Sequence, residues 1–140
     1  EVPYDVYMDL NYHLQFTVDS CYYSGGGAVS DALHLRSPTI TWQGDALYNR
    51  IGSAMVRQAG LGECVAHDEA EYVALARRAI QDGPWRENLR ARLEAADLDR
   101  TVYGTGEAVH FAAAVDYLIE NHERLRAETA AGIREPIRIH

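Results

Sequence analysis

A glycine run, Ser24-Gly25-Gly26-Gly27, separates two stretches of different hydrophobic periodicity. The stretch before it, Leu14-Gln15-Phe16-Thr17-Val18, is short, apolar and partly β-branched, which favours a β-strand. The stretch after it, Ala28-Val29-Ser30-Asp31-Ala32-Leu33, has helical spacing. A strand, a glycine turn and a helix N-terminus in this order are typical of phosphate sites in α/β proteins, because free N–H groups face the anion. The alternative is a plain flexible turn, which a triple glycine also favours.

A second unit of the same kind follows directly. The segment Thr39-Ile40-Thr41-Trp42 predicts a strand that ends at Gln43-Gly44-Asp45, and a helix over about 46–59 follows with Asp45 as its candidate cap. Two such units imply adjacent parallel strands whose loops open on one sheet edge. Gly44-Asp45 and the glycine run are therefore expected to line one crevice. The predicted fold class is α/β, a Rossmann-like parallel sheet flanked by helices.

The remaining pattern adds few strands. A third, short strand is expected around Cys64-Val65, and the predicted helices run over about 3–12, 28–35, 69–81 and 107–127. Another helix is predicted to begin at Pro84, with Leu89 and Leu93 on its buried side. Asp68 is the expected cap of the helix that begins at residue 69. We predict a partial nucleotide-binding domain over residues 1–127 and a tail over 128–140. Three strands are few for a doubly wound sheet, so we expect the back half of a domain within a longer protein.

Composition excludes several classes of protein. The chain has 140 residues, 47% of them hydrophobic, and a net charge of −8, which suits one domain with a real core and argues against nucleic-acid and anionic-membrane partners. All 13 basic residues are arginine, so no P-loop lysine and no Schiff-base lysine exists. No membrane span and no signal peptide are predicted. Cys21 and Cys64 are too few for a disulfide scaffold and predict free thiols in a cytoplasmic protein.

Few side chains suggest specific chemistry. Asp31 lies about one turn into its helix, where it could bind a ribose or simply complement the helix dipole. Arg50 could reach a diphosphate or pair with Asp45. The six histidines form no metal-like i, i+4 pair, so no metal site is predicted. No Ser–His–Asp or Cys–His order can be defended, and the catalytic residues stay unknown.

An ordered set of motifs resembles a known family. The set matches the C-terminal donor-binding domain of glycosyltransferase family 41, which includes the O-linked N-acetylglucosamine transferases and the bacterial N-glucosyltransferases of adhesins. The resemblance covers about residues 3–121, and the stretch 101–106 is closer to the bacterial branch. The motifs are Tyr23-Ser24-Gly25-Gly26-Gly27, Asp31-Ala32-Leu33, Ser37-Pro38-Thr39, Gly44-Asp45, Arg50, Gly60-Leu61-Gly62 and Glu71-Tyr72-Val73-Ala74-Leu75-Ala76.

The resemblance implies a GT-B fold and an inverting transfer, without metal or other cofactor, of a hexose or N-acetylhexosamine from a UDP-sugar to Asn or Ser/Thr side chains. It implies that the turn Gly25-Gly26-Gly27-Ala28 holds the diphosphate through backbone N–H groups and that Asp31 holds the ribose. Tyr4 and Tyr7 fall where family members contact phosphate and base, with lysine and histidine common there. The full expected nucleotide-sugar site is Ser24, Gly25, Gly26, Gly27, Ala28, Asp31, Tyr4, Tyr7, Gly44 and Arg50.

The expected partners are a nucleotide-sugar, a polypeptide acceptor, and the N-terminal part of the same protein or a partner chain. Two alternatives stay open. The chain could be a catalytically inactive nucleotide-binding or protein-interaction module, or a Rossmann-like domain for another nucleotide. The second is weaker, because no G-x-G-x-x-G with a downstream ribose acid occurs.

Overall fold

The computed structural model describes residues 2–104, 106 and 108–133. The chain separates into two compact units, residues 1–103 and 104–140. This structural division lies between Tyr103 and Gly104. The nucleotide-binding extent over residues 1–127, with a tail over 128–140, stays a prediction.

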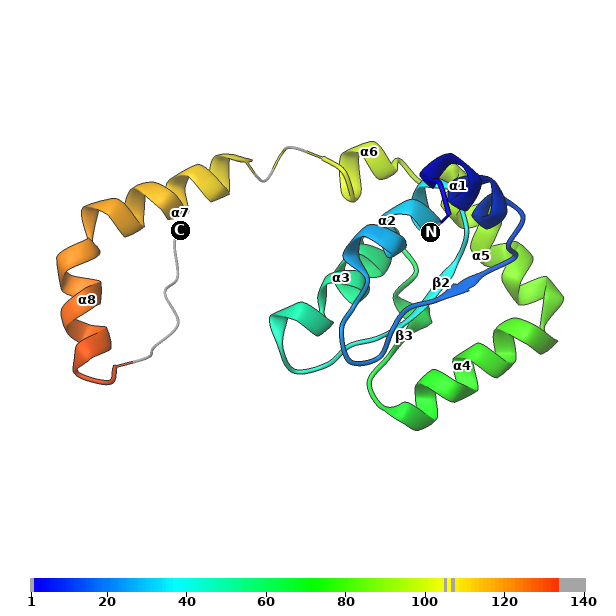
Figure 1. Cartoon of the computed structure of the whole chain (residues 1–140), viewed down its shortest axis with the longest axis horizontal. Coiled ribbons are helices and arrows are strands. Elements are labelled where there is room, and N and C mark those ends of the chain that lie inside the picture. The colour runs from blue at the N-terminus through cyan, green and yellow to red at the C-terminus, as the bar shows by residue number, and fades with distance from the viewer. Residues whose placement is uncertain (1, 105, 107, 134–140) are drawn as a thin grey trace. The chain divides into compact units, whose positions relative to one another are not determined.

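The first unit is built on a parallel three-stranded sheet (Figure 1). The strand order is β1-β2-β3; Thr17 lies opposite Thr39, and Thr41 lies opposite Val65. Parallel pairing of β1 with β2 confirms the predicted α/β fold with helices around a parallel sheet. The elements are α1 (Tyr4–Tyr12), β1 (Thr17–Val18), α2 (Gly26–His34), β2 (Thr39–Trp42), η1 (Leu47–Asn49), α3 (Ile51–Gln58), η2 (Gly62–Cys64), β3 (Val65–Ala66), α4 (Glu69–Gln81), α5 (Gly83–Ala95) and α6 (Leu98–Thr101).

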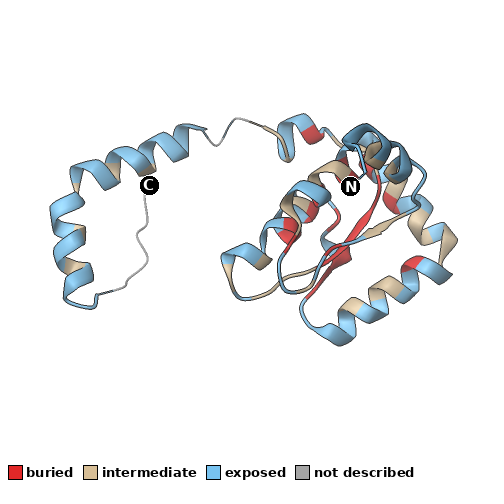
Figure 2. Ribbon diagram, viewed as in Figure 1, coloured by how far each residue is buried: buried red, intermediate tan, exposed pale blue. Residues whose placement is uncertain are grey.

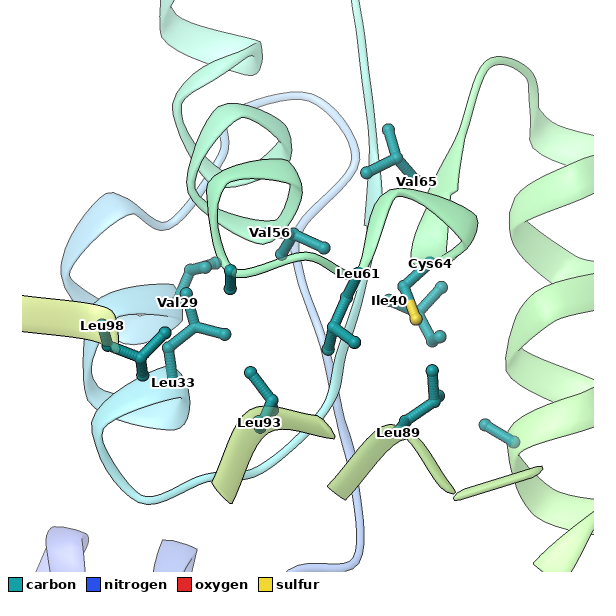
Figure 3. Close-up of a cluster of buried hydrophobic side chains, with 12 residues drawn as sticks. Val29, Leu33, Ile40, Val56, Leu61, Cys64, Val65, Leu89, Leu93 and Leu98 are labelled. Carbon is teal, nitrogen blue, oxygen red and sulfur yellow. The ribbon is translucent and has the colours of Figure 1, made fainter. Parts of the chain in front are cut away.

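The core of this unit lies between the sheet and its helices. The central strand β2 is the most deeply buried segment (Figure 2), with Ile40 fully excluded from solvent. Figure 3 shows Leu89 and Leu93 of α5 meeting Leu61 beside β2, with Val29 and Leu33 of α2 nearby. Aliphatic side chains at helical spacing therefore pack around β2, which is buried as strands of parallel sheets usually are. Its two threonines, Thr39 and Thr41, are buried as well, and each forms side-chain hydrogen bonds.

Short-range signals correctly predicted several helix boundaries. The Asp68 side chain accepts from the Glu71 N–H at 2.8 Å and caps α4, and the Asp82 side chain accepts from the Trp85 N–H at 3.0 Å at the start of α5. Gly60, with φ of 81°, follows the end of α3, because glycine adopts this left-handed conformation without strain.

Two other predicted boundaries were wrong. α2 begins at Gly26 rather than at Ala28, so two of the glycines form its first turn. The single helix expected over 46–59 is instead η1 followed by α3, which starts only at Ile51. Asp45 caps neither: the Asn49 side chain accepts from the Ala46 N–H at 2.9 Å and closes the turn itself.

The second unit contains α7 (Ala108–Glu120) and α8 (His122–Ala130), neither of which has a buried residue. The one long helix predicted over 107–127 is therefore wrong: the chain breaks at Asn121, and residue 107 lies outside the described residues. The Asn121 side chain donates to the Tyr117 carbonyl at 2.9 Å, and the same carbonyl accepts from the Asn121 N–H at 3.0 Å. No helix among the described residues has the length and apolar composition needed to cross a membrane.

The two thiols differ in environment, and we expect them to differ in reactivity. Cys64 is buried, and burial raises the pKa of its thiol to about 12, so almost no thiolate exists at pH 8. Cys21 is partly exposed. Iodoacetamide at pH 8 should therefore modify Cys21 in the native chain while Cys64 reacts only after denaturation, as mass spectrometry of peptides can measure. Equal labelling rates in the native chain would contradict this packing.

Candidate functional site

The glycine turn lies between the end of β1 and the start of α2. Gly25 is the N-cap of α2, and the first helical bond joins the Val29 N–H to the Gly25 carbonyl at 2.8 Å. A helix leaves its first N–H groups without helical partners. The Gly25 N–H donates to Asp19 Oδ1 at 2.8 Å, and the Gly26 N–H donates to the Ser24 carbonyl at 3.0 Å.

Two amides of the turn therefore remain for a ligand. Within the described part of the chain, nothing accepts from the N–H groups of Gly27 and Ala28. Both residues are exposed at the positive end of the α2 dipole, and α2 is nine residues long. Such amides bind anions. Of the four N–H groups predicted to bind the diphosphate, those of Gly25–Ala28, only the last two are free to do so.

Asp19 is the side chain that builds this turn, and it is nearly buried, with 6% exposed. Its Oδ1 accepts from the N–H groups of Ser20 at 2.9 Å and Gly25 at 2.8 Å. Its Oδ2 accepts from Ser24 Oγ at 2.7 Å and Thr41 Oγ1 at 2.9 Å. One carboxylate therefore ties the turn to the end of β2.

The same network holds the next loop against the turn. Ser24 Oγ accepts from the Gly52 N–H at 2.8 Å, and the Ser24 N–H donates to the Tyr48 carbonyl at 3.1 Å. A Cβ on Gly52 would lie 2.5 Å from both Asp19 Oδ2 and Ser24 Oγ, so only glycine fits there. The Ser24 hydroxyl therefore forms its hydrogen bonds within the protein, to Asp19 and Gly52. Its predicted contact with a ligand stays a prediction.

Asp31 lies near α1 as well as on α2. The Tyr4 hydroxyl donates to Asp31 Oδ1 at 2.8 Å, and this hydrogen bond raises the pKa of the Tyr4 phenol. The rings of Tyr4 and Tyr7 stack with their centroids 5.9 Å apart. These three side chains, with Val2 and Pro3, line an open hollow of about 670 Å³. The structure therefore brings Tyr4, Tyr7 and Asp31 together, and their predicted contacts with a nucleotide stay a prediction.

Gly44 and Arg50 lie in the loop after β2. Arg50 Nε donates to the Gly44 carbonyl at 2.7 Å, while Asp45 forms no ion pair with Arg50 among the described residues. The pairing of Arg50 with Asp45 is therefore not observed. Gly44 has no room for a Cβ, because the Asn49 side chain lies against it. The loop reaches the turn at the next residue, Ile51, whose Cγ2 lies 3.1 Å from the Cβ position of Gly26.

A second hollow, of about 690 Å³, runs along β1 and is lined mainly by apolar side chains. Of the predicted site residues, only Tyr7, Gly25 and Ala28 reach it. No group of three or more His, Cys, Asp or Glu side chains is placed to hold a metal ion within residues 2–104, 106 and 108–133. The expectation that no metal takes part stays a prediction.

Comparisons with known proteins bear on this arrangement, although no protein-family model matches the sequence. A Hordeum vulgare protein named as a probable UDP-N-acetylglucosamine–peptide N-acetylglucosaminyltransferase, SPINDLY, is 30% identical over 80 residues, which is 57% of this chain. The SPINDLY protein of Oryza sativa subsp. japonica is 29% identical over the same length. A mutant of the Thermobaculum terrenum O-GlcNAc transferase superposes with a TM-score of 0.64 at 26% identity over 67% of this chain.

This chain is related to the O-GlcNAc transferases. The resemblance to glycosyltransferase family 41 is thereby confirmed. The chain spans 8% and 9% of the two SPINDLY proteins and 18% of the bacterial transferase. Its relatives are glycosyltransferases, but the relationship covers only a small part of each of them.

Sequence reasoning missed Asp19 and Gly52. Asp19 directly follows an apolar strand, and Thr41 is the next-to-last residue of the neighbouring strand. An acidic residue at one strand end and a hydroxyl at the next were a detectable signal, because parallel strands end at the same sheet edge. Gly52 gave no such signal, since its contacts depend on how two distant loops meet.

Proposed function

We propose that the first unit is the donor-binding portion of an inverting protein glycosyltransferase that binds the UDP moiety of a UDP-sugar. The free N–H groups of Gly27 and Ala28, at the N-terminus of α2, carry this proposal. A diphosphate would accept from these amides, and the positive end of the dipole favours its charge. The relationship to O-GlcNAc transferases supports a nucleotide-sugar as the anion.

The hollow lined by Tyr4, Tyr7 and Asp31 suits the nucleoside. Asp31 offers a carboxylate to the ribose hydroxyls, and the stacked rings of Tyr4 and Tyr7 offer an apolar face to a base. Arg50 is proposed to supply a cation to the diphosphate, since it directly precedes Ile51, which contacts the turn at Gly26. The proposed reaction transfers a hexose or N-acetylhexosamine to Asn or Ser/Thr side chains of a polypeptide, in the cytoplasm. The residues that perform the chemistry are proposed to come from another part of the same protein or from a partner chain.

A titration with UDP in the presence of EDTA tests the nucleotide site. We expect amide NMR shifts at Gly27, Ala28 and Asp31, because the backbone takes the place that a metal ion has in other diphosphate sites. Binding should be weak, since this chain is proposed to supply one side of the site. Shifts confined to residues remote from 24–31, or no shifts at millimolar UDP, would overturn the proposal.

Asp31→Ala should weaken UDP binding by roughly ten- to a hundredfold, because hydrogen bonds to a charged group are worth about 1.5–3 kcal/mol. If Asp31 only complements the helix dipole, the same change should lower the free energy of unfolding by about 0.3–1 kcal/mol and leave affinity unchanged. Calorimetric titration and thermal unfolding of the same variant separate these roles. Asp45→Ala is the matched control, because that carboxylate is exposed and caps no helix.

The alternative of a catalytically inactive binding module has one observation in its favour. Tyrosines stand at positions 4 and 7, where the resemblance implies lysine and histidine, so these side chains give the diphosphate no positive charge. UDP binding would support both alternatives. Transfer from UDP-N-acetylglucosamine or UDP-glucose to a peptide, assayed with the full-length protein, distinguishes them.

A further inference from the structure

The hydrogen bond between Tyr4 and Asp31 joins α1 to α2. α1 has no buried residue, and Tyr4 itself is 63% exposed. Within the described residues, no other hydrogen bond joins α1 to another helix or strand. This bond is therefore a tether between α1 and α2.

The tether occupies a group that the proposed function needs. Tyr4 donates to Asp31 Oδ1, and no hydrogen-bond donor from the described residues reaches Oδ2. The two vicinal hydroxyls of a ribose can donate to both oxygens of one carboxylate. Such two-point pairing brings a ribose hydroxyl to the same Oδ1 that accepts from Tyr4 in the free protein, next to a ring that lines the same hollow.

We propose that Tyr4 acts as a gate on Asp31. The Tyr4 hydroxyl is hydrogen-bonded to the Asp31 carboxylate in the free protein and leaves it when a ribose binds. This rests on the proposed nucleotide site. The ring of Tyr4 lines the same hollow as Tyr7, so its rotation away from Asp31 also enlarges the space for a nucleoside. A vicinal diol can form two hydrogen bonds to Asp31 where the phenol forms one, so the exchange favours ribose over sugars that lack the diol.

The structure also explains how the gate can open. Rotation of Tyr4 breaks one exposed hydrogen bond and one ring stack but removes nothing from the core. Segments with few buried contacts open at low free-energy cost. α1 is such a segment, whereas α2 is fixed through the buried side chains of Val29, Ala32 and Leu33. The carboxylate therefore stays in place while the gate moves.

Tyr4→Phe tests the gate with UDP as the probe. Removing the hydroxyl frees Asp31 Oδ1 and keeps the ring, so the variant should bind UDP about three- to tenfold more tightly than the natural chain, because one competing hydrogen bond is lost. With 2′,3′-dideoxyuridine diphosphate the variant should bind no more tightly than the natural chain. Tyr12→Phe is the matched control, since Tyr12 lies on the same helix with the same exposure of 63% and outside the proposed site.

A second measurement needs no ligand. Amide hydrogen exchange across α1 should be faster in Tyr4→Phe than in Tyr12→Phe, because only the first change removes the tether. Unchanged or weaker UDP affinity in Tyr4→Phe, in a chain that binds UDP, overturns the gate and leaves the proposed nucleotide site intact. Equal exchange rates in the two variants overturn the tether. If neither the natural chain nor Tyr4→Phe binds UDP, the proposed nucleotide site fails and the gate fails with it.

Discussion

Gly52→Ala is expected to lower the free energy of unfolding by about 2–4 kcal/mol, because a methyl group there overpacks a buried site and separates hydrogen-bonded partners. The new Cβ would lie 2.5 Å from Asp19 Oδ2 and from Ser24 Oγ, closer than van der Waals contact allows. The Gly52 N–H also donates to Ser24 Oγ at 2.8 Å, so the backbone cannot move away without losing that bond.

Gly27→Ala is the matched control for this stability change. Gly27, like Gly52, lies in the first turn of a helix, but nothing lies within 4 Å of its Cβ position. Alanine is the better helix former by about 1 kcal/mol, so this variant should be as stable as the natural chain or slightly more stable. Urea unfolding followed by circular dichroism gives both values. Equal stability of the two variants would mean that the loop carrying Gly52 does not pack on the turn.

Local patterns predicted the parts of this fold that local chemistry decides. β2 was predicted from the segment Thr39-Ile40-Thr41-Trp42, and α4 from Asp68 as its cap and the helical spacing of the apolar residues that follow. The parallel order followed from two strand–loop–helix units in succession. In each case the sequence signal for an individual strand, turn or helix lies within a few residues along the chain.

The parts that sequence reasoning missed depend on contacts between distant residues. Glycines were interpreted as a loop before the helix, yet Gly26 and Gly27 are helical because the Asp19 carboxylate holds Gly25 as N-cap. The bond from Tyr4 to Asp31 spans 27 positions, and that from Ser24 to Gly52 spans 28. No periodicity or short motif contains either pair. The residues of the proposed site were predicted, but the network that shapes it was not.

Asp19→Ala is expected to be at least as destabilising as Gly52→Ala. It should lower the free energy of unfolding by about 3–5 kcal/mol, because it removes the charged acceptor from a buried network. The hydroxyls of Ser24 and Thr41, both at most 2% exposed, would lose the oxygen to which they donate. The Gly25 N–H would lose its acceptor as well, so the first turn of α2 should fray.

Asp19→Asn separates the charge from the shape of this side chain. Its carbonyl oxygen can still accept from Ser20 and Gly25, while its amide group would have to donate to hydroxyls that now donate to Asp19. Thr41 can turn its hydroxyl to accept from this amide group, whereas Ser24 Oγ already accepts from the Gly52 N–H. Because only part of the network is disturbed, the free energy of unfolding should fall by about 1–2 kcal/mol, less than in Asp19→Ala. Urea unfolding of the three proteins, with amide exchange at Gly25, gives the order natural chain, Asp19→Asn, Asp19→Ala. Asp45→Ala should match the natural chain, since that side chain is exposed. A similar stability for Asp19→Ala and Asp45→Ala would show that the turn holds its conformation without the carboxylate, and the free amides of Gly27 and Ala28 would then owe their position to the glycine backbone alone.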